Sequence, residues 1–155
     1  YHRVMECLNY SKAGSTEDIK NEIDRMVREE KLSLKQAECI KLKDIDTFAG
    51  SSIGERIKRA YAYGGVKREQ PFVFEYDRQL VQGVIDLYFI EDGQLVIVDY
   101  KTDRVLRGRA GEDELRRRYS IQLDYYAMAL SQITGLKVKE KVIYSFALGR
   151  SLTVE

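Results

Sequence analysis

The sequence predicts an α/β fold in which a small mixed β-sheet is flanked by helices and preceded by a helical region. Three observations support this prediction: helical spacing of apolar residues through the first 63 positions, three strand-like segments within 67–101, and a long amphipathic segment at 112–133 followed by another strand. At 155 residues the chain has the length of one domain. We expect a single domain over 1–155, with 1–63 mainly helical and 67–155 forming an αβ core.

Serines mark the expected starts of the N-terminal helices. Ser15, Ser33 and Ser52 each stand three positions before an acidic residue or a glutamine, which is the spacing of a capping box. The tract "YAYGGVK" then interrupts the helical pattern with two adjacent glycines. We therefore expect the helices to end there.

The strands are expected at about 67–76, 78–90 and 94–101. Pro71 lies in the first of them, which indicates an edge strand or a strand entry because proline cannot donate to the sheet. A basic loop leads to the long helix, which Gly135 should end. "KVKEKVIYSFAL" and "SLTVE" predict two further strands.

The stretch "QGVIDLYFIEDGQLVIVDYKTD" carries a carboxylate in each of two apolar runs. Asp92-Gly93 is typical of a two-residue hairpin turn. In that register Asp86 lies opposite Asp99 on one face, with β-carbons about 5 Å apart; a three-residue bulged loop would shift the pairing by one. Because both faces are otherwise apolar, the two acids should lie in a partly dry place.

Two carboxylates in such a place repel unless one is protonated or a cation lies between them. Mg²⁺ is the natural cation, because it binds one or two carboxylates and keeps several waters. Lys101, two residues beyond Asp99, projects from the same face. The alternatives are surface or capping roles for the aspartates and a structural salt bridge with Lys101.

The composition excludes several classes of site. The 26 basic and 25 acidic residues nearly cancel, so overall charge indicates no partner. Two cysteines are too few for a disulfide framework, a zinc site or an iron–sulfur cluster, and reduced thiols suit the cytoplasm. The sequence contains no secretory signal, no membrane-length apolar run and no phosphate-binding loop, so no membrane and no ATP site are expected in this fragment.

The motifs "GVID" and "VDYKT" together resemble the PD-(D/E)xK nuclease motif, and "QLVIVDYKTDRV" is most similar to AddA-type, RecB-family C-terminal nuclease domains. "YHRVMECL", "REQPFVF" and "YSIQLDYYAMAL" extend the resemblance over most of the chain. The resemblance implies a restriction-endonuclease-like core. It also implies a domain excised from a longer bacterial helicase–nuclease chain, which fits a sequence that starts at Tyr1 within an apparent helix.

The resemblance implies roles for individual residues. Asp86 and Asp99 are the metal-binding acids, Lys101 is the catalytic lysine, and the backbone carbonyl of Tyr100 is a further ligand. His2 matches the family's histidine ligand on the first helix. Mg²⁺ is the expected cofactor, with Mn²⁺ as an alternative. A lone histidine such as His2 is otherwise more often a surface or core residue.

Gln122 and Tyr126 match the family's Q-x-x-x-Y element near the DNA. The alternative is a core stripe, but Leu123 and Leu130 already provide a neighbouring apolar seam, so a polar Gln122 is better explained as pointing at the site. Glu69 resembles a glutamate found in relatives. It either lines the site or keeps a strand edge soluble.

A basic run follows Lys101, and it is either a solvated loop or a patch that contacts a nucleic-acid backbone. Its arginines are Arg104, Arg107, Arg109, Arg116, Arg117 and Arg118. No base-reading element is evident, so sequence-specific cleavage is not indicated.

The expected function is a metal-dependent DNA nuclease domain that degrades strands exonucleolytically beside a helicase in double-strand-break processing. Its expected partners are DNA, the rest of the parent chain and a second, AddB-type subunit. The alternatives are a non-catalytic nucleic-acid-binding or scaffolding domain on the same fold and a phosphohydrolase of small substrates. The intact set of Asp86, Asp99 and Lys101 disfavours the scaffold.

Overall fold

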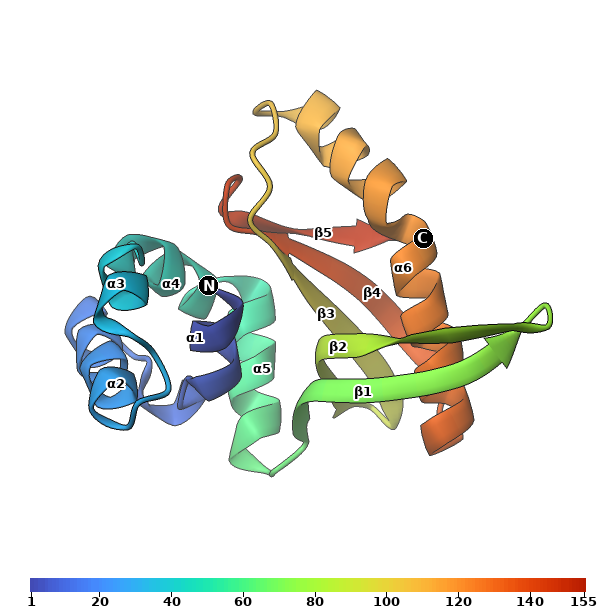
Figure 1. The fold of residues 1–155 in the computed structure, drawn as a ribbon, viewed down its shortest axis with the longest axis horizontal. Helices are drawn as coiled ribbons and strands as arrows, with labels where there is room; N and C mark the ends of the chain where they lie inside the picture. Colours follow the sequence, from blue (N-terminus) through green and yellow to red (C-terminus); the bar gives the residue numbers. More distant parts are fainter. The chain divides into compact units, whose positions relative to one another are not determined.

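The computed structural model describes residues 1–155, which divide into two compact units, Tyr1–Gly64 and Gly65–Glu155 (Figure 1). The boundary falls within the predicted glycine tract. The first unit is helical, with α1 His2–Cys7, the 3₁₀ helix η1 Tyr10–Lys12, α2 Thr16–Arg28, α3 Leu34–Glu38, α4 Leu42–Ala49 and α5 Ser52–Ala62. The second has β1 Val66–Tyr76, β2 Gln79–Glu91, β3 Gln94–Lys101, α6 Arg109–Thr134, β4 Val138–Ser145 and β5 Arg150–Val154. The predicted α/β fold class is confirmed.

Serine side chains cap three of the helices. Ser15 begins α2 by accepting a hydrogen bond from the Asp18 amide, and Ser33 and Gln36 form the reciprocal capping box of α3. The cap of α5 is Ser51, one residue before the predicted Ser52. The shift arises because Ser51 has the extended backbone of an N-cap, and its hydroxyl also donates to the preceding helix at the Phe48 carbonyl.

A buried ion pair holds α2 against the turn that precedes it. Glu22 is 4% exposed, and its carboxylate accepts hydrogen bonds from the Asn9 amide at 2.9 Å and from two nitrogens of Arg25 at 2.7 and 3.0 Å. Burial raises the pKa of Glu22, but the donors from Arg25 and Asn9 outweigh it, so the net pKa lies below its ordinary value. The charged form of Glu22 therefore stabilises the fold.

Replacing Glu22 by glutamine is expected to lower the free energy of unfolding at pH 7 by about 1.5–3 kcal/mol, because hydrogen bonds to a charged group are lost. The contribution of Glu22 is present above its unfolded pKa, about 4.3, and is lost as pH falls through the lower folded value. Urea unfolding at pH 7 and at pH 3 should show the difference between the two chains shrinking in acid. An equal difference at both values would contradict this account; Glu29→Gln, at a more exposed partner of Arg25, is the control.

The second unit is built on one five-stranded sheet with the order β1-β2-β3-β4-β5. Neighbouring strands are antiparallel except β3 and β4, which are parallel and are connected through α6. Pro71 lies in β1 at the edge of the sheet, as predicted. Because β3 is central, the lysine at its end is anchored on both sides by neighbouring strands.

The turn between β2 and β3 has the predicted two-residue form. Asp92 and Gly93 both have positive φ, +53° and +72°, which is typical of a type I′ turn. Glu91 pairs with Gln94, and the ladder continues in this register to the pair formed by Leu87 and Val98. The bulged alternative is thereby excluded.

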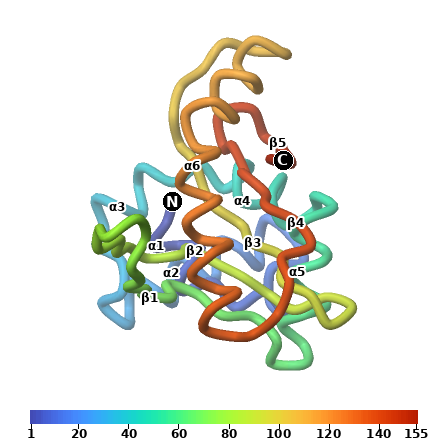
Figure 2. Tube along the Cα trace, turned by 90° about the vertical axis from the view of Figure 1, so that its right-hand side faces the viewer, coloured from blue at the N-terminus to red at the C-terminus, as the bar shows by residue number.

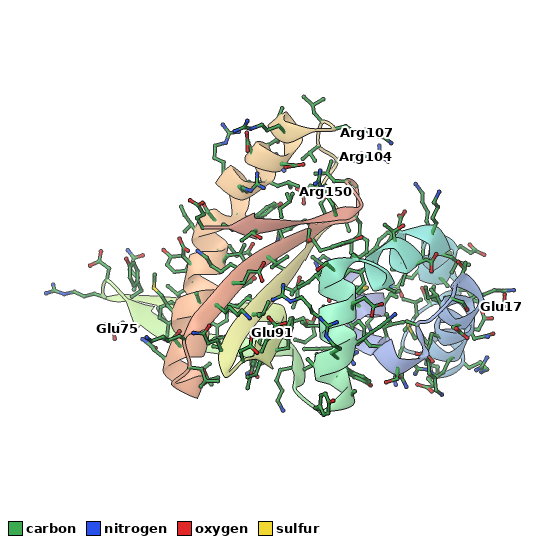
Figure 3. All side chains as sticks on the ribbon, turned by 180° about the vertical axis from the view of Figure 1, so that it is seen from behind. Glu17, Glu75, Glu91, Arg104, Arg107 and Arg150 are labelled. Atoms are coloured by element: carbon green, nitrogen blue, oxygen red, sulfur yellow. The ribbon has the colours of Figure 1, made fainter.

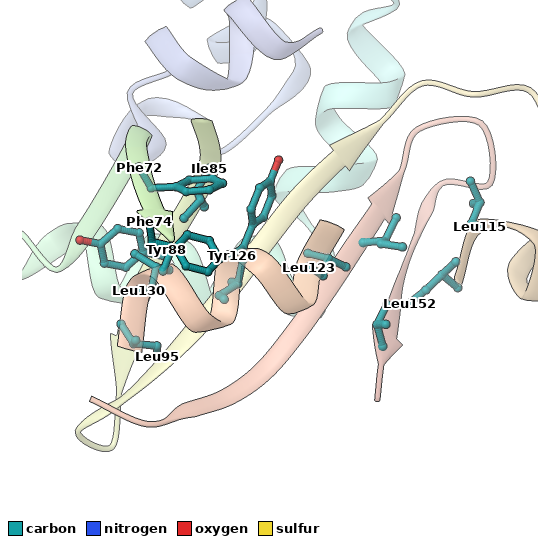
Figure 4. Packing of buried hydrophobic residues seen from close by; sticks show 14 residues of the cluster. Phe72, Phe74, Ile85, Tyr88, Leu95, Leu115, Leu123, Tyr126, Leu130 and Leu152 are labelled. Atoms are coloured by element: carbon teal, nitrogen blue, oxygen red, sulfur yellow. The ribbon is translucent and has the colours of Figure 1, made fainter. Parts of the chain in front are cut away.

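One face of the sheet packs against α6, which crosses the strands (Figure 2). The cluster beneath the helix joins aromatic residues of β1 and β2 to Leu123, Tyr126 and Leu130 of α6 (Figure 4). The helix starts at Arg109, three residues before the predicted position, and ends at Gly135 with φ +72° as predicted. None of the helices, the 26-residue α6 included, combines the length and apolar character of a membrane span.

Candidate active site

The two aspartates of the hairpin meet at the end away from the turn. Continuing the β2–β3 register one step beyond Leu87 and Val98 places Asp86 opposite Asp99. The Asp86 carboxylate accepts a hydrogen bond from the Tyr100 amide at 2.8 Å, which ties it to β3. Asp99 is only 1% exposed. The structure therefore brings the two predicted acids together on neighbouring strands.

A kink in β1 lies beside Asp86. The pairing of β1 with β2 skips the step at which Glu69 would face Asp86, and Glu69 has a φ of +46°. The alternation of faces changes at this point, because Ile85 and Tyr88 belong to the same buried cluster although they are three residues apart. The kink thus places Asp86 at an irregular position next to Glu69.

Lys101 ends β3 beside these acids. Its Nζ lies 2.7 Å from Oδ2 of Asp99 and donates to Oε1 of Gln122 at 3.1 Å. Gln122 in turn donates through Nε2 to the hydroxyl of Tyr126 at 2.6 Å. Four predicted site residues therefore form one connected network between β3 and α6.

Tyr126 is both a core residue and a neighbour of the acids. Its ring packs edge-on against Phe72 at a centroid distance of 5.6 Å. Burial raises the pKa of the Tyr126 phenol strongly, and the charges of Asp99, Asp86 and Glu69 raise it further, in that order. The phenol is therefore neutral at neutral pH, and the three carboxylates gather negative potential around it.

Two residues of the site were not among the predicted ones. The ring of Tyr119 lies under the Lys101 ammonium, 4.1 Å from centroid to Nζ, and its hydroxyl donates to Asp103 at 2.8 Å. Arg118 donates to the same Asp103 oxygen at 2.8 Å. Burial raises the pKa of Asp103, but the donors from Tyr119 and Arg118 outweigh it, so its pKa lies below the ordinary value. The spacing of Tyr119 to Gln122 on α6 indicates the shared face; no pattern marks Asp103.

The predicted basic patch divides into two kinds of arginine. Arg116 donates to the Thr153 carbonyl and to Asp113, and Arg118 pairs with Asp103 and Glu114, so both are used within the fold. The others are exposed: Arg104 and Arg107 on the loop between β3 and α6 (Figure 3), and Arg109 and Arg117 on the first turns of α6.

His2 is the first residue of α1, and its side chain is exposed. It belongs to the helical unit, whereas Asp86 and Asp99 belong to the other unit. Its role as a ligand stays a prediction.

The donor atoms around Lys101 fit a hard divalent cation. Two carboxylates on adjacent strands, one of them buried, are the ligands that Mg²⁺ accepts while retaining several waters. Nowhere in the chain do three His, Cys, Asp or Glu side chains converge as a preformed cluster. A cation at this site would therefore be held by Asp86 and Asp99, with main-chain oxygen and water completing its shell.

Residues 1–152 match the family model described as the PD-(D/E)XK nuclease superfamily. The chain is 40% identical to the A-type ATP-dependent helicase/nuclease subunit of Thermoanaerobacter sp. (strain X514) and 35% identical to that of Clostridium novyi (strain NT). These alignments cover 97% and 94% of the chain but only 13% of each relative. A putative exonuclease from Eubacterium rectale shares 16% identity at a TM-score of 0.47, over 88% of this chain and 54% of that one. The predicted AddA-type resemblance is confirmed, and the chain belongs to the PD-(D/E)XK nuclease superfamily.

Proposed function

We propose that the chain is a metal-dependent deoxyribonuclease domain that hydrolyses phosphodiester bonds. The observation that carries the proposal is the position of Lys101, whose ammonium is held by Asp99 and Gln122 beside a second acid, Asp86. A fixed cation next to two carboxylates is the arrangement that phosphodiester cleavage needs, because charge develops on a phosphate that the site must also orient.

Each residue has a proposed task. Asp86, Asp99 and the Tyr100 carbonyl hold the divalent ion, with His2 as a further ligand. The ion, Mg²⁺ or Mn²⁺, supplies a water of lowered pKa and polarises the phosphate. Lys101 stabilises negative charge on the phosphate oxygens, and Gln122 keeps the ammonium aimed at them.

The relatives carry the names of helicase/nuclease subunits, and this chain spans 13% of their length. We propose that it acts exonucleolytically on DNA delivered by a helicase part of a longer bacterial, cytoplasmic protein, together with an AddB-type subunit. The exposed arginines Arg104, Arg107, Arg109 and Arg117 suit contacts with the DNA backbone, since phosphate contacts position a strand without reading its sequence.

The test is degradation of linear single- and double-stranded DNA by the chain in Mg²⁺, in Mn²⁺ and in EDTA. Release of nucleotides that requires metal supports the proposal. DNA binding without cleavage in any metal would favour the non-catalytic binding domain. Hydrolysis of p-nitrophenyl phosphate with no attack on DNA would favour a phosphohydrolase of small substrates.

The Tyr119 ring is expected to position the lysine. Tyr119→Leu removes the ring under the Lys101 ammonium and should lower kcat for DNA cleavage roughly tenfold, within the range of a partly buried cation–π contact. Tyr119→Phe keeps the ring, loses only the hydrogen bond to Asp103, and should retain most of that activity. Equal losses in the two variants would contradict a role for the ring.

A further inference from the structure

A groove opens beside the catalytic network, between α6 and the part of β2 that pairs with β1. Its volume is about 360 Å³, within the range of sites for small ligands. Its lining consists of Phe72, Val81, Gln82, Gly83, Arg118, Ile121, Gln122, Tyr125 and Tyr126. Gln122 and Tyr126 belong to both the groove and the network that holds Lys101, so the two are continuous.

The walls of the groove are apolar and its ends are polar. Ile121 is 64% exposed on α6, which is unusual for a large aliphatic residue unless something covers it. The Tyr125 ring follows one turn later, packed edge-to-face with Phe74 and Tyr76. Arg118 lies one turn before Ile121 on the same face of the helix.

Glycine at position 83 keeps the opposite wall open. A β-carbon there would come within 2.9 Å of the Phe72 ring, so any larger residue would push that ring toward the groove. Gly83 pairs with Phe72 in the sheet and faces the same side as Val81. The space next to Gln122 is therefore built into the packing of β1 and β2.

We propose that this groove receives an unpaired nucleobase of the strand whose phosphate lies at Lys101. A base presents apolar faces, which fit Ile121 and the Tyr125 ring, and polar edges, which fit the amides of Gln82 and Gln122. Arg118 carries positive charge for the neighbouring phosphate. Because a paired base keeps its faces stacked, the substrate class is a single strand; this inference rests on the nuclease function proposed above.

The test is fluorescence anisotropy of the 155-residue chain with a labelled eight-nucleotide oligothymidylate and with an abasic oligonucleotide of the same length. Ca²⁺ replaces Mg²⁺, and a gel checks that the probes stay intact. The oligothymidylate should bind about tenfold more tightly than the abasic probe, since stacking of one base contributes at least that much. Equal affinities, or binding of neither probe, would overturn the inference.

Two isoleucines of α6 give matched variants. Ile121→Ala should remove the preference for the oligothymidylate and leave the affinity for the abasic probe unchanged. Ile133→Ala, at a residue 55% exposed outside the groove, should keep the preference. Equal weakening of both probes by Ile121→Ala would mean that the residue serves the fold or a protein contact, which would overturn the inference.

The inference and the proposed function can fail separately. Metal-dependent cleavage of DNA by a chain that binds both probes equally would leave the nuclease and remove the base site. A preference for bases that Ile121→Ala abolishes, without cleavage in any metal, would leave the base site and remove the nuclease.

Discussion

Replacing Lys101 by alanine is expected to lower kcat for DNA cleavage by roughly two to three orders of magnitude, the usual cost of removing one preorganised charge-stabilising group. Lys101 Nζ is fixed by contacts of 2.7 Å to Asp99 and 3.1 Å to Gln122, so no other cation replaces it without rebuilding the site. The measurement is the rate of nucleotide release at saturating Mg²⁺, with circular dichroism to show that the variant is folded.

Lys139 provides the matched control for this lysine. It lies on β4, and its ammonium pairs with Glu91 at 2.8 Å and Asp92 at 2.7 Å, at the turn end of the hairpin. Lys139→Ala should therefore leave cleavage unchanged. If Lys101 only formed a structural salt bridge with Asp99, Lys101→Ala would lower the melting temperature and leave the activity of the folded fraction intact, which would contradict the catalytic role.

Replacing Asp99 by asparagine is expected to abolish cleavage, by roughly three orders of magnitude or more, because the metal would lose its buried ligand and several kcal/mol of charge stabilisation with it. Asparagine keeps the shape of the side chain, which matters at a position 1% exposed. Raising the Mn²⁺ concentration should not restore the rate. Restoration would show that Asp99 only tunes metal affinity.

Asp92→Asn is the matched control for the aspartate. Asp92 lies in the type I′ turn with φ +53°, a conformation that asparagine adopts well, so the fold should tolerate the change. The charge removed is the same, but it lies at the opposite end of the hairpin from Asp99. Loss of cleavage in this variant would indicate a general effect of charge rather than a metal site.

The hairpin was predictable from sequence because its geometry is local. Asp92-Gly93 sets the turn, the turn sets the register, and the register brings Asp86 to Asp99. Alternation along β3 then puts Lys101 on the same face. Each step involves residues that are neighbours along the chain or across one ladder.

Features that depend on packing between distant segments were not predictable. Asp103 lies in a loop without periodicity, and only the position of α6 brings Tyr119 to it. The kink at Glu69 depends on a left-handed backbone that a non-glycine sequence does not signal. Counting arginines likewise could not tell that Arg116 is used within the fold, because its partner is the carbonyl of Thr153, a main-chain atom.

The most direct test of the metal site is a calorimetric Mn²⁺ titration of the unsubstituted chain, Lys101→Ala and Asp99→Asn. The account predicts that the unsubstituted chain and Lys101→Ala bind Mn²⁺ with the same stoichiometry and that Asp99→Asn does not bind it. Equal Mn²⁺ binding in all three proteins, or in none, would contradict the claim that the two carboxylates of the hairpin hold a metal ion beside the lysine.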